Sequence, residues 1–164
     1  MGQQELILTL GAIVLFSLVS LSVNRLVVNH TDAIYSQQAE LYAVSVAQQF
    51  IEEAKLKAFD ENTITGTVSN PGGFSSWGQW GFETGETYPN FDDVDDFHGF
   101  TTTLTTDVGA MTINITVDYV EDSDLDVPVT PTKTYYKKMT VIVQSDYLIN
   151  PVTAEYIFAF QKNP

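Results

Sequence analysis

The chain contains no cysteine and few basic residues, and each shortage excludes a class of function. Without cysteine there are no disulfides, no thiolate nucleophiles and no cysteine-ligated zinc or iron–sulfur centres. Seven Lys and Arg residues stand against 21 acidic ones, which gives a formal net charge of −14. A negative field of this size argues against a nucleic acid held by its phosphate backbone as a partner.

Signatures of catalysis are also missing. The 164 residues include two histidines, and they lack a Gly-x-Ser-x-Gly elbow, a His-Glu-x-x-His motif and a phosphate-binding loop. His98 lies beside an acidic turn, where a single imidazole is usually structural. We therefore expect a protein that is not an enzyme and requires no cofactor. The length suits one domain with one core.

An apolar run dominates the N-terminal region. The 18 residues from Leu6 to Val23 carry no charge and span roughly 27 Å as a helix, which is just enough to cross a bilayer core. Glu5 precedes the run and Arg25 follows it, whereas a secretory signal peptide places its basic residues before the run. Residues 1–24 are thus predicted to form a transmembrane or assembly helix.

The helical pattern continues from Asn24 to Phe59 without Pro or Gly, so one long helix is predicted, apolar in its first half and amphipathic in its second. The expected apolar stripe of the second half consists of Leu26, Val27, Ala33, Ile34, Leu41, Val44, Ala47, Phe50, Ile51, Ala54 and Leu56. We expect a globular head over 25–164, with this half-helix at 25–59, a long loop at 62–99 and a sheet at 100–164.

Alternating polarity and β-branched residues predict about four antiparallel strands, at 100–106, 110–120, 134–145 and 154–161. The acidic, Pro-containing segment Glu121–Pro131 is interpreted as a solvated loop, and its acids are Glu121, Asp122, Asp124 and Asp126. The apolar face of the sheet is expected to cover the amphipathic half-helix. The predicted fold class is therefore α+β in two layers.

One loop segment crowds four carboxylates into five residues: Asp92, Asp93, Asp95 and Asp96. Like charges this close require a cation, solvent or protonation, and Ca²⁺ suits a cluster of oxygen ligands. The spacing does not match an EF-hand loop, so the alternative of a solvated or helix-capping turn stays open.

The two-part N-terminal helix, a glutamate four residues after the first residue, the long loop and the terminal sheet together resemble a type IV pilin or a related pseudopilin. The resemblance covers the whole chain in architecture, and in motif it is strong from Met1 to Val23. The segment "NFDDVDDFHGF" is similar to an aspartate-rich stretch in some pilin-like proteins. The chain departs from many members in lacking a proline within the apolar half and a C-terminal disulfide.

The resemblance implies roles for Met1 and Glu5. Prepilins are cut by a membrane peptidase, and Glu5 has the family position if Met1 is the mature residue. The carboxylate would then meet the α-ammonium of a neighbouring subunit, an attraction of about 4 kcal/mol at 4 Å and an effective dielectric of 20, before desolvation is subtracted. The alternative is a glutamate that rests at the lipid headgroups.

The resemblance also implies a function. The expected protein is a structural subunit that polymerises as a homo-oligomer into an extracellular, cell-surface pilus-like filament. Before assembly it would lie in the inner membrane and meet the prepilin peptidase and the pilus assembly machinery. Two alternatives remain: a pseudopilin or minor pilin of a secretion or pilus machine, and a monomeric membrane-anchored binding module.

Overall fold

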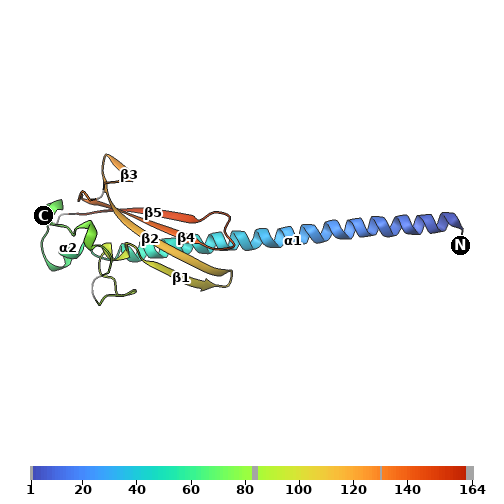
Figure 1. The fold of residues 1–164 in the computed structure, drawn as a ribbon, viewed down its shortest axis with the longest axis horizontal. Coiled ribbons are helices and arrows are strands. Elements are labelled where there is room, and N and C mark those ends of the chain that lie inside the picture. Colours follow the sequence, from blue (N-terminus) through green and yellow to red (C-terminus); the bar gives the residue numbers. More distant parts are fainter. Residues whose placement is uncertain (1, 83–84, 130, 162–164) are drawn as a thin grey trace. The chain divides into compact units, whose positions relative to one another are not determined.

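The computed structural model describes residues 2–82, 85–129 and 131–161. It confirms the α+β fold, in which a long N-terminal helix packs on a C-terminal antiparallel sheet (Figure 1). The chain forms two compact units, Met1–Gln38 and Ala39–Pro164. We call the second the sheet unit, and it includes the C-terminal part of the helix.

Helix α1 runs from Gln3 to Ala54. The sequence predicted that it continues to Phe59, and this boundary was wrong. After a final turn, Ala58 pairs with the acidic loop instead: its N–H donates to the Asp92 carbonyl, and its own carbonyl accepts from the Val94 N–H, each at 3.0 Å. Tertiary pairing of the backbone thus ends the helix where local propensity would extend it.

Within the sheet unit, α1 buries a narrow face that consists mainly of small side chains: Ala39, Ala43, Val46, Ala47, Phe50, Ile51 and Ala54. Their spacing of three and four residues places them on one side of the helix. The predicted stripe was wrong at seven of its eleven positions, which are exposed: Leu26, Val27, Ala33, Ile34, Leu41, Val44 and Leu56. Alanines let the helix backbone approach the sheet closely, so the larger side chains lie on the other faces.

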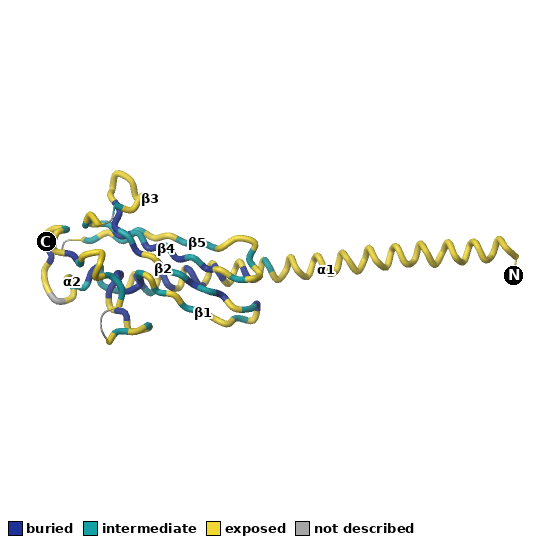
Figure 2. Tube along the Cα trace, viewed as in Figure 1, coloured by how far each residue is buried: buried dark blue, intermediate teal, exposed yellow. Residues whose placement is uncertain are grey.

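The N-terminal part of α1 has no buried face. Residues 2–38 are exposed apart from the half-buried Ser36, including every large apolar side chain between Leu6 and Val28 (Figure 2). By length and composition this part of α1 can span a membrane. A long apolar surface of this kind requires lipid or protein to cover it.

The strand order in the sheet is β1-β2-β4-β5, with all neighbours antiparallel. These strands are β1 (Thr101–Thr106), β2 (Gly109–Glu121), β4 (Tyr136–Gln144) and β5 (Val152–Ala159). They match the four predicted strands to within a few residues.

A fifth strand, β3 (Asp124–Pro128), pairs with the end of β2 across a register shift between Val120 and Glu121. The sequence assigned this segment to a loop, and that assignment was wrong. Polarity alternates from Asp124 to Val127, but the acids and Pro128 favoured a loop, and all five residues of the strand are exposed. Its acids are nonetheless solvated, as expected.

The inner face of the sheet follows strict alternation. Met111, Ile113, Ile115 and Val117 of β2 are buried, and Met139, Val141 and Val143 of β4 lie opposite them in register. Together with the buried face of α1 and the loop residues Phe91, Val94 and Phe97 they form the main core.

The segment predicted as a loop contains short helices that position its aromatic residues. They are α2 (Glu61–Thr65), η1 (Pro71–Gly73), η2 (Trp77–Gln79) and η3 (Asp95–Phe97). A second, smaller core forms here from Val68, Phe74 and Tyr119, with Phe59, Trp80, Val129 and Phe160 packed against it. The loop aromatics are therefore largely structural, although Trp77 and Phe82 remain exposed.

The narrow helix face leads to the first prediction. Ala47→Leu should destabilise the sheet unit by about 1–3 kcal/mol, because the added side chain has no room between helix and sheet. Leu41→Ala, on the exposed side of the same helix, should change stability by less than about 0.5 kcal/mol. Thermal unfolding of the full chain in detergent, followed by fluorescence of Trp77 and Trp80, checks both values. Equal losses in the two variants would contradict the assigned face.

Candidate functional sites at the helix N-terminus and in the sheet unit

Glu5 lies in the first turn of α1 and is exposed. Its Oε2 accepts a hydrogen bond from the Gly2 N–H at 3.2 Å, which satisfies one of the free amides at the helix start. A carboxylate also suits this position because of the helix dipole. Met1, the other predicted assembly residue, lies outside the described residues. The structure therefore places the Glu5 carboxylate against the Gly2 amide, just before α1 begins.

The four clustered aspartates do not share one environment. Asp92 is exposed, whereas Asp93, Asp95 and Asp96 are buried. Asp93 Oδ1 accepts from the N–H groups of Asp95 and Asp96, at 2.7 and 3.1 Å. Asp96 Oδ2 accepts from the N–H groups of Asp92 and Asp93, at 3.0 and 3.2 Å. Two of the acids thus hold the turn together through its backbone.

The structure brings two of the predicted cation ligands together with a third acid. Oxygens of Asp92, Asp96 and Glu86 lie within 4.8 Å of one another. Asp96 is fully buried, and its Oδ1 has no hydrogen-bond partner among the described residues. Asp93 and Asp95 serve other contacts, so the trio of Glu86, Asp92 and Asp96 is the better candidate for Ca²⁺.

Asp95 pairs with a lysine that the sequence analysis did not single out. Lys137 of β4 is fully buried, and its Nζ contacts Asp95 Oδ1. The same Nζ donates to Asp60 Oδ2 at 3.0 Å and to the Phe59 carbonyl at 2.7 Å. One amine thus contacts the segment after α1, the acidic turn and the sheet. We call Lys137, Asp60 and Asp95 the buried lysine cluster.

The two carboxylates of the cluster are supported unequally. Asp60 Oδ1 caps α2 by accepting from the Asn62 N–H, and it also accepts from the N–H and the hydroxyl of Ser75. Asp60 Oδ2 accepts from Lys137 and from the Tyr119 hydroxyl at 3.4 Å. Asp95 Oδ2, in contrast, is buried without a hydrogen-bond partner among the described residues.

Aromatic rings surround the amine. Lys137 Nζ lies 4.6 Å from the ring centroid of Phe59, 5.1 Å from that of Trp80 and 5.4 Å from that of Tyr119. Tyr119 lies directly opposite Lys137 in the register of β2 and β4. Cation–π attraction stabilises an ammonium in such a pocket, but the loss of water opposes every charge in it.

Burial raises the pKa of two acids in the acidic turn, Asp93 and Asp95. Desolvation raises the pKa of Asp95 to about 7, although Lys137 opposes the shift. Desolvation, followed by the charges of Asp95 and Asp96, raises the pKa of Asp93 to about 8. Burial and the neighbouring Asp60 also raise the pKa of the Tyr119 hydroxyl. Asp93 and Asp95 therefore retain protons at pH values where exposed aspartates have lost them.

A sequence signal for Lys137 did exist. It stands in the same alternation as Met139, Val141 and Val143, which places a lysine on the apolar face of a strand. Asp60 carried a weaker signal, as an N-cap residue before a short helix. The contacts of Lys137 with Asp60 and Asp95 join three segments that lie apart in the sequence, so no local pattern predicts them.

The two histidines differ in their surroundings. The ring of His98 interacts through Nδ1 with the backbone of Val117, 2.7 Å from its carbonyl oxygen. His30 is exposed on α1.

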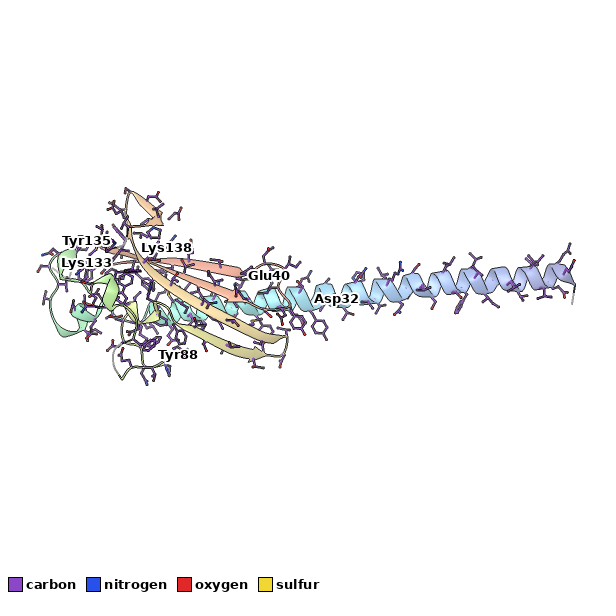
Figure 3. The ribbon with its side chains drawn as sticks, viewed as in Figure 1. Asp32, Glu40, Tyr88, Lys133, Tyr135 and Lys138 are labelled. Atoms are coloured by element: carbon purple, nitrogen blue, oxygen red, sulfur yellow. The ribbon has the colours of Figure 1, made fainter. Side chains whose placement is uncertain are left out.

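A pocket of about 450 Å³ is lined by Phe82, Thr87, Tyr88, Phe91, Gly99, Phe100 and Thr101. The Tyr88 hydroxyl beside it donates to Glu53 Oε2 at 3.0 Å, and Figure 3 labels this tyrosine.

Comparison with known proteins assigns no family to this arrangement. No protein-family model, curated protein or solved structure matches the chain.

Calcium binding stays a prediction, now centred on Glu86, Asp92 and Asp96. Saturating Ca²⁺ should raise the melting temperature of the full chain in detergent by roughly 5–10 °C relative to chelator, because a ligand bound by the folded state alone stabilises it. Asp92→Asn should abolish the rise and should leave the buried acids in place. Asp122→Asn, in the solvated acidic segment, is the matched control and should keep it. The same melting temperature in Ca²⁺ and in chelator would contradict the proposed Ca²⁺ site.

Proposed function

We propose that this protein is a structural subunit of an extracellular, type IV pilus-like filament. The observation that supports this most is the division of one helix into two surfaces. Residues 2–38 expose apolar side chains on all sides, and residues from Ala39 to Ala54 bury one face in the sheet unit. The first surface suits lipid before assembly and a bundle of identical helices afterwards.

Glu5 would fix the register of that bundle. Its carboxylate stands at the edge of the apolar run, at the exposed start of α1. In a dry bundle of helices it would be neutralised by the α-ammonium of a neighbouring subunit. The value of such a pair lies chiefly in specificity, because breaking it leaves one buried charge without a partner.

Two other functions use the same features differently. A pseudopilin or minor pilin would assemble into a short filament or at a filament tip, so abundance and filament length distinguish it from a major subunit. A monomeric membrane-anchored module would use the aromatic pocket beside Tyr88 for binding. Phe82 supports this alternative, because it lines the pocket and is exposed to a ligand. In a monomer the carboxylate at position 5 would only cap the start of α1 through the Gly2 N–H, and it would have no role between chains.

The filament proposal predicts the phenotype of Glu5→Gln. The substitution keeps the size of the side chain and leaves the neighbour's ammonium unpaired, which typically costs several kcal/mol. Since each 1.4 kcal/mol is a factor of ten, sheared surface filaments should fall roughly tenfold or more. Membrane insertion should survive because the apolar run is unchanged.

Asp32→Asn is the matched control for this experiment, because it removes a carboxylate from the same helix outside the apolar run (Figure 3). Immunoblots of sheared filaments and of membrane fractions measure both variants, and the control should assemble normally. Wild-type filament yield from Glu5→Gln cells would contradict the role of Glu5. A wild-type protein that is always monomeric and forms no filament would contradict the proposed function itself.

A further inference from the structure

The buried lysine cluster combines the parts of a condensation reaction. It contains an amine, a carboxyl group in contact with that amine and a second carboxyl group that also contacts it. Water is excluded, since Lys137 and Asp60 are fully buried and Asp95 is 3% exposed. We propose that Lys137 Nζ and the Asp95 side chain join in an intramolecular isopeptide bond, formed with Asp60 as the acid–base catalyst.

The structure distinguishes the two carboxyl groups. Asp60 accepts hydrogen bonds from Asn62, Ser75, Tyr119 and Lys137, which together stabilise a carboxylate. Asp95 accepts from Lys137 through Oδ1, and its buried Oδ2 has no partner in the described part of the chain. Four residues hold the oxygens of Asp60, whereas Asp95 Oδ2 is held by none among the described residues, so a carboxyl oxygen can leave Asp95 without breaking other hydrogen bonds. Asp95 is therefore better placed to act as the electrophile, and Asp60 is better placed to act as the base.

The pocket also suits the amine. Transfer of one proton from the Lys137 ammonium to the Asp95 carboxylate gives the neutral amine and the neutral acid that the reaction requires, inside a pocket walled by Phe59, Trp80 and Tyr119. A desolvated lysine is an activated nucleophile. Because the fold holds it against the carboxyl group, the reaction is intramolecular and gains from proximity.

The step balances without any other reactant. The Nζ lone pair attacks Cγ of the protonated Asp95, and a C–N bond forms as the carbonyl π pair moves to oxygen. Asp60 Oδ2, 3.0 Å from Nζ, takes a proton from the nitrogen and delivers it to the departing hydroxyl. The electron pair on oxygen re-forms the C=O bond as the C–O bond to the departing hydroxyl breaks, and water leaves. An ammonium and a carboxylate have become an amide and water, with no change of oxidation state.

The bond would tie η3 to β4 in a chain that has no cysteine for a disulfide. It would close a loop that contains β1, β2 and β3, and cross-links of this kind stabilise a fold mainly by restricting its unfolded state. The inference does not depend on the filament proposal, since every residue involved belongs to the sheet unit.

Intact mass tests the bond directly. The denatured full chain should weigh about 18 Da, one water, less than its sequence requires, when calibrated against Lys137→Met so that any N-terminal processing cancels. Lys138→Met is the matched control: Lys138 is the next residue of β4, it pairs with Glu155 at 3.5 Å, and Figure 3 labels it. This variant should keep the loss. A wild-type chain with no loss relative to Lys137→Met would overturn the proposal.

Two further variants test the roles of the acids. Asp95→Asn can still react but must release ammonia, so its loss should change to about 17 Da. Asp60→Asn keeps both bonding groups and removes the base, so the loss should disappear or develop slowly. An unchanged 18 Da loss in Asp95→Asn would overturn Asp95 as the partner, and an unchanged rate in Asp60→Asn would overturn Asp60 as the catalyst.

Digestion locates the bond. No Lys or Arg lies between Ala58 and Lys133, and trypsin does not cut at an acylated lysine, so peptide 58–133 should remain joined to peptide 134–138. Cleavage after Glu61 and Glu86 then separates Asp60 from Asp95. A link between Lys137 and fragment 87–121 supports the proposal, and a link to fragment 58–61 contradicts the assignment to Asp95.

Discussion

The packing of the sheet unit depends on one buried amine. Lys137 Nζ contacts the Phe59 carbonyl, Asp60 and Asp95, so the segment after α1 and the acidic turn are both fixed against β4. A lone lysine in such a pocket would be very costly, and so would the acids without it. Ala58 adds backbone pairing with the same turn. Polar contacts in the core thus determine where α1 ends and how the long loop folds back.

The rest of the fold is governed by the close approach of helix and sheet. Alanines on the buried face of α1 let the backbone lie near the β2 and β4 side chains, and Phe50 fills the space beside Tyr88 and Phe100. This explains why large residues such as Leu41 are exposed on the same helix. The N-terminal part of α1 contributes nothing to this core, so its apolar surface is available for a membrane or for other copies of the chain.

The two candidate regions use charge in opposite ways. Glu5 is a single exposed carboxylate at the start of an apolar surface, where it acquires a strong partner only if another molecule supplies one. In the sheet unit, Asp60, Asp95 and Lys137 already supply one another's partners, away from water. The carboxylate of Glu5 favours assembly between chains, and the buried lysine cluster favours a stable fold of the single chain. Both properties would serve the filament proposed above.

The sequence by itself determined the elements, and tertiary structure decided the sites. Periodicity predicted the long helix, the change in its character and four strands, because each of these patterns repeats within a single segment. It missed β3, whose side chains are all exposed, and it chose the wrong face for Leu41 and Val44, because apolar character alone does not say which side a sheet will cover. The acidic turn was recognisable as a cluster of like charges. The sequence did not show what each aspartate of the turn contacts. Asp92 and Asp96 meet Glu86, and Asp95 meets Lys137, so these contacts join residues that are separated in the chain.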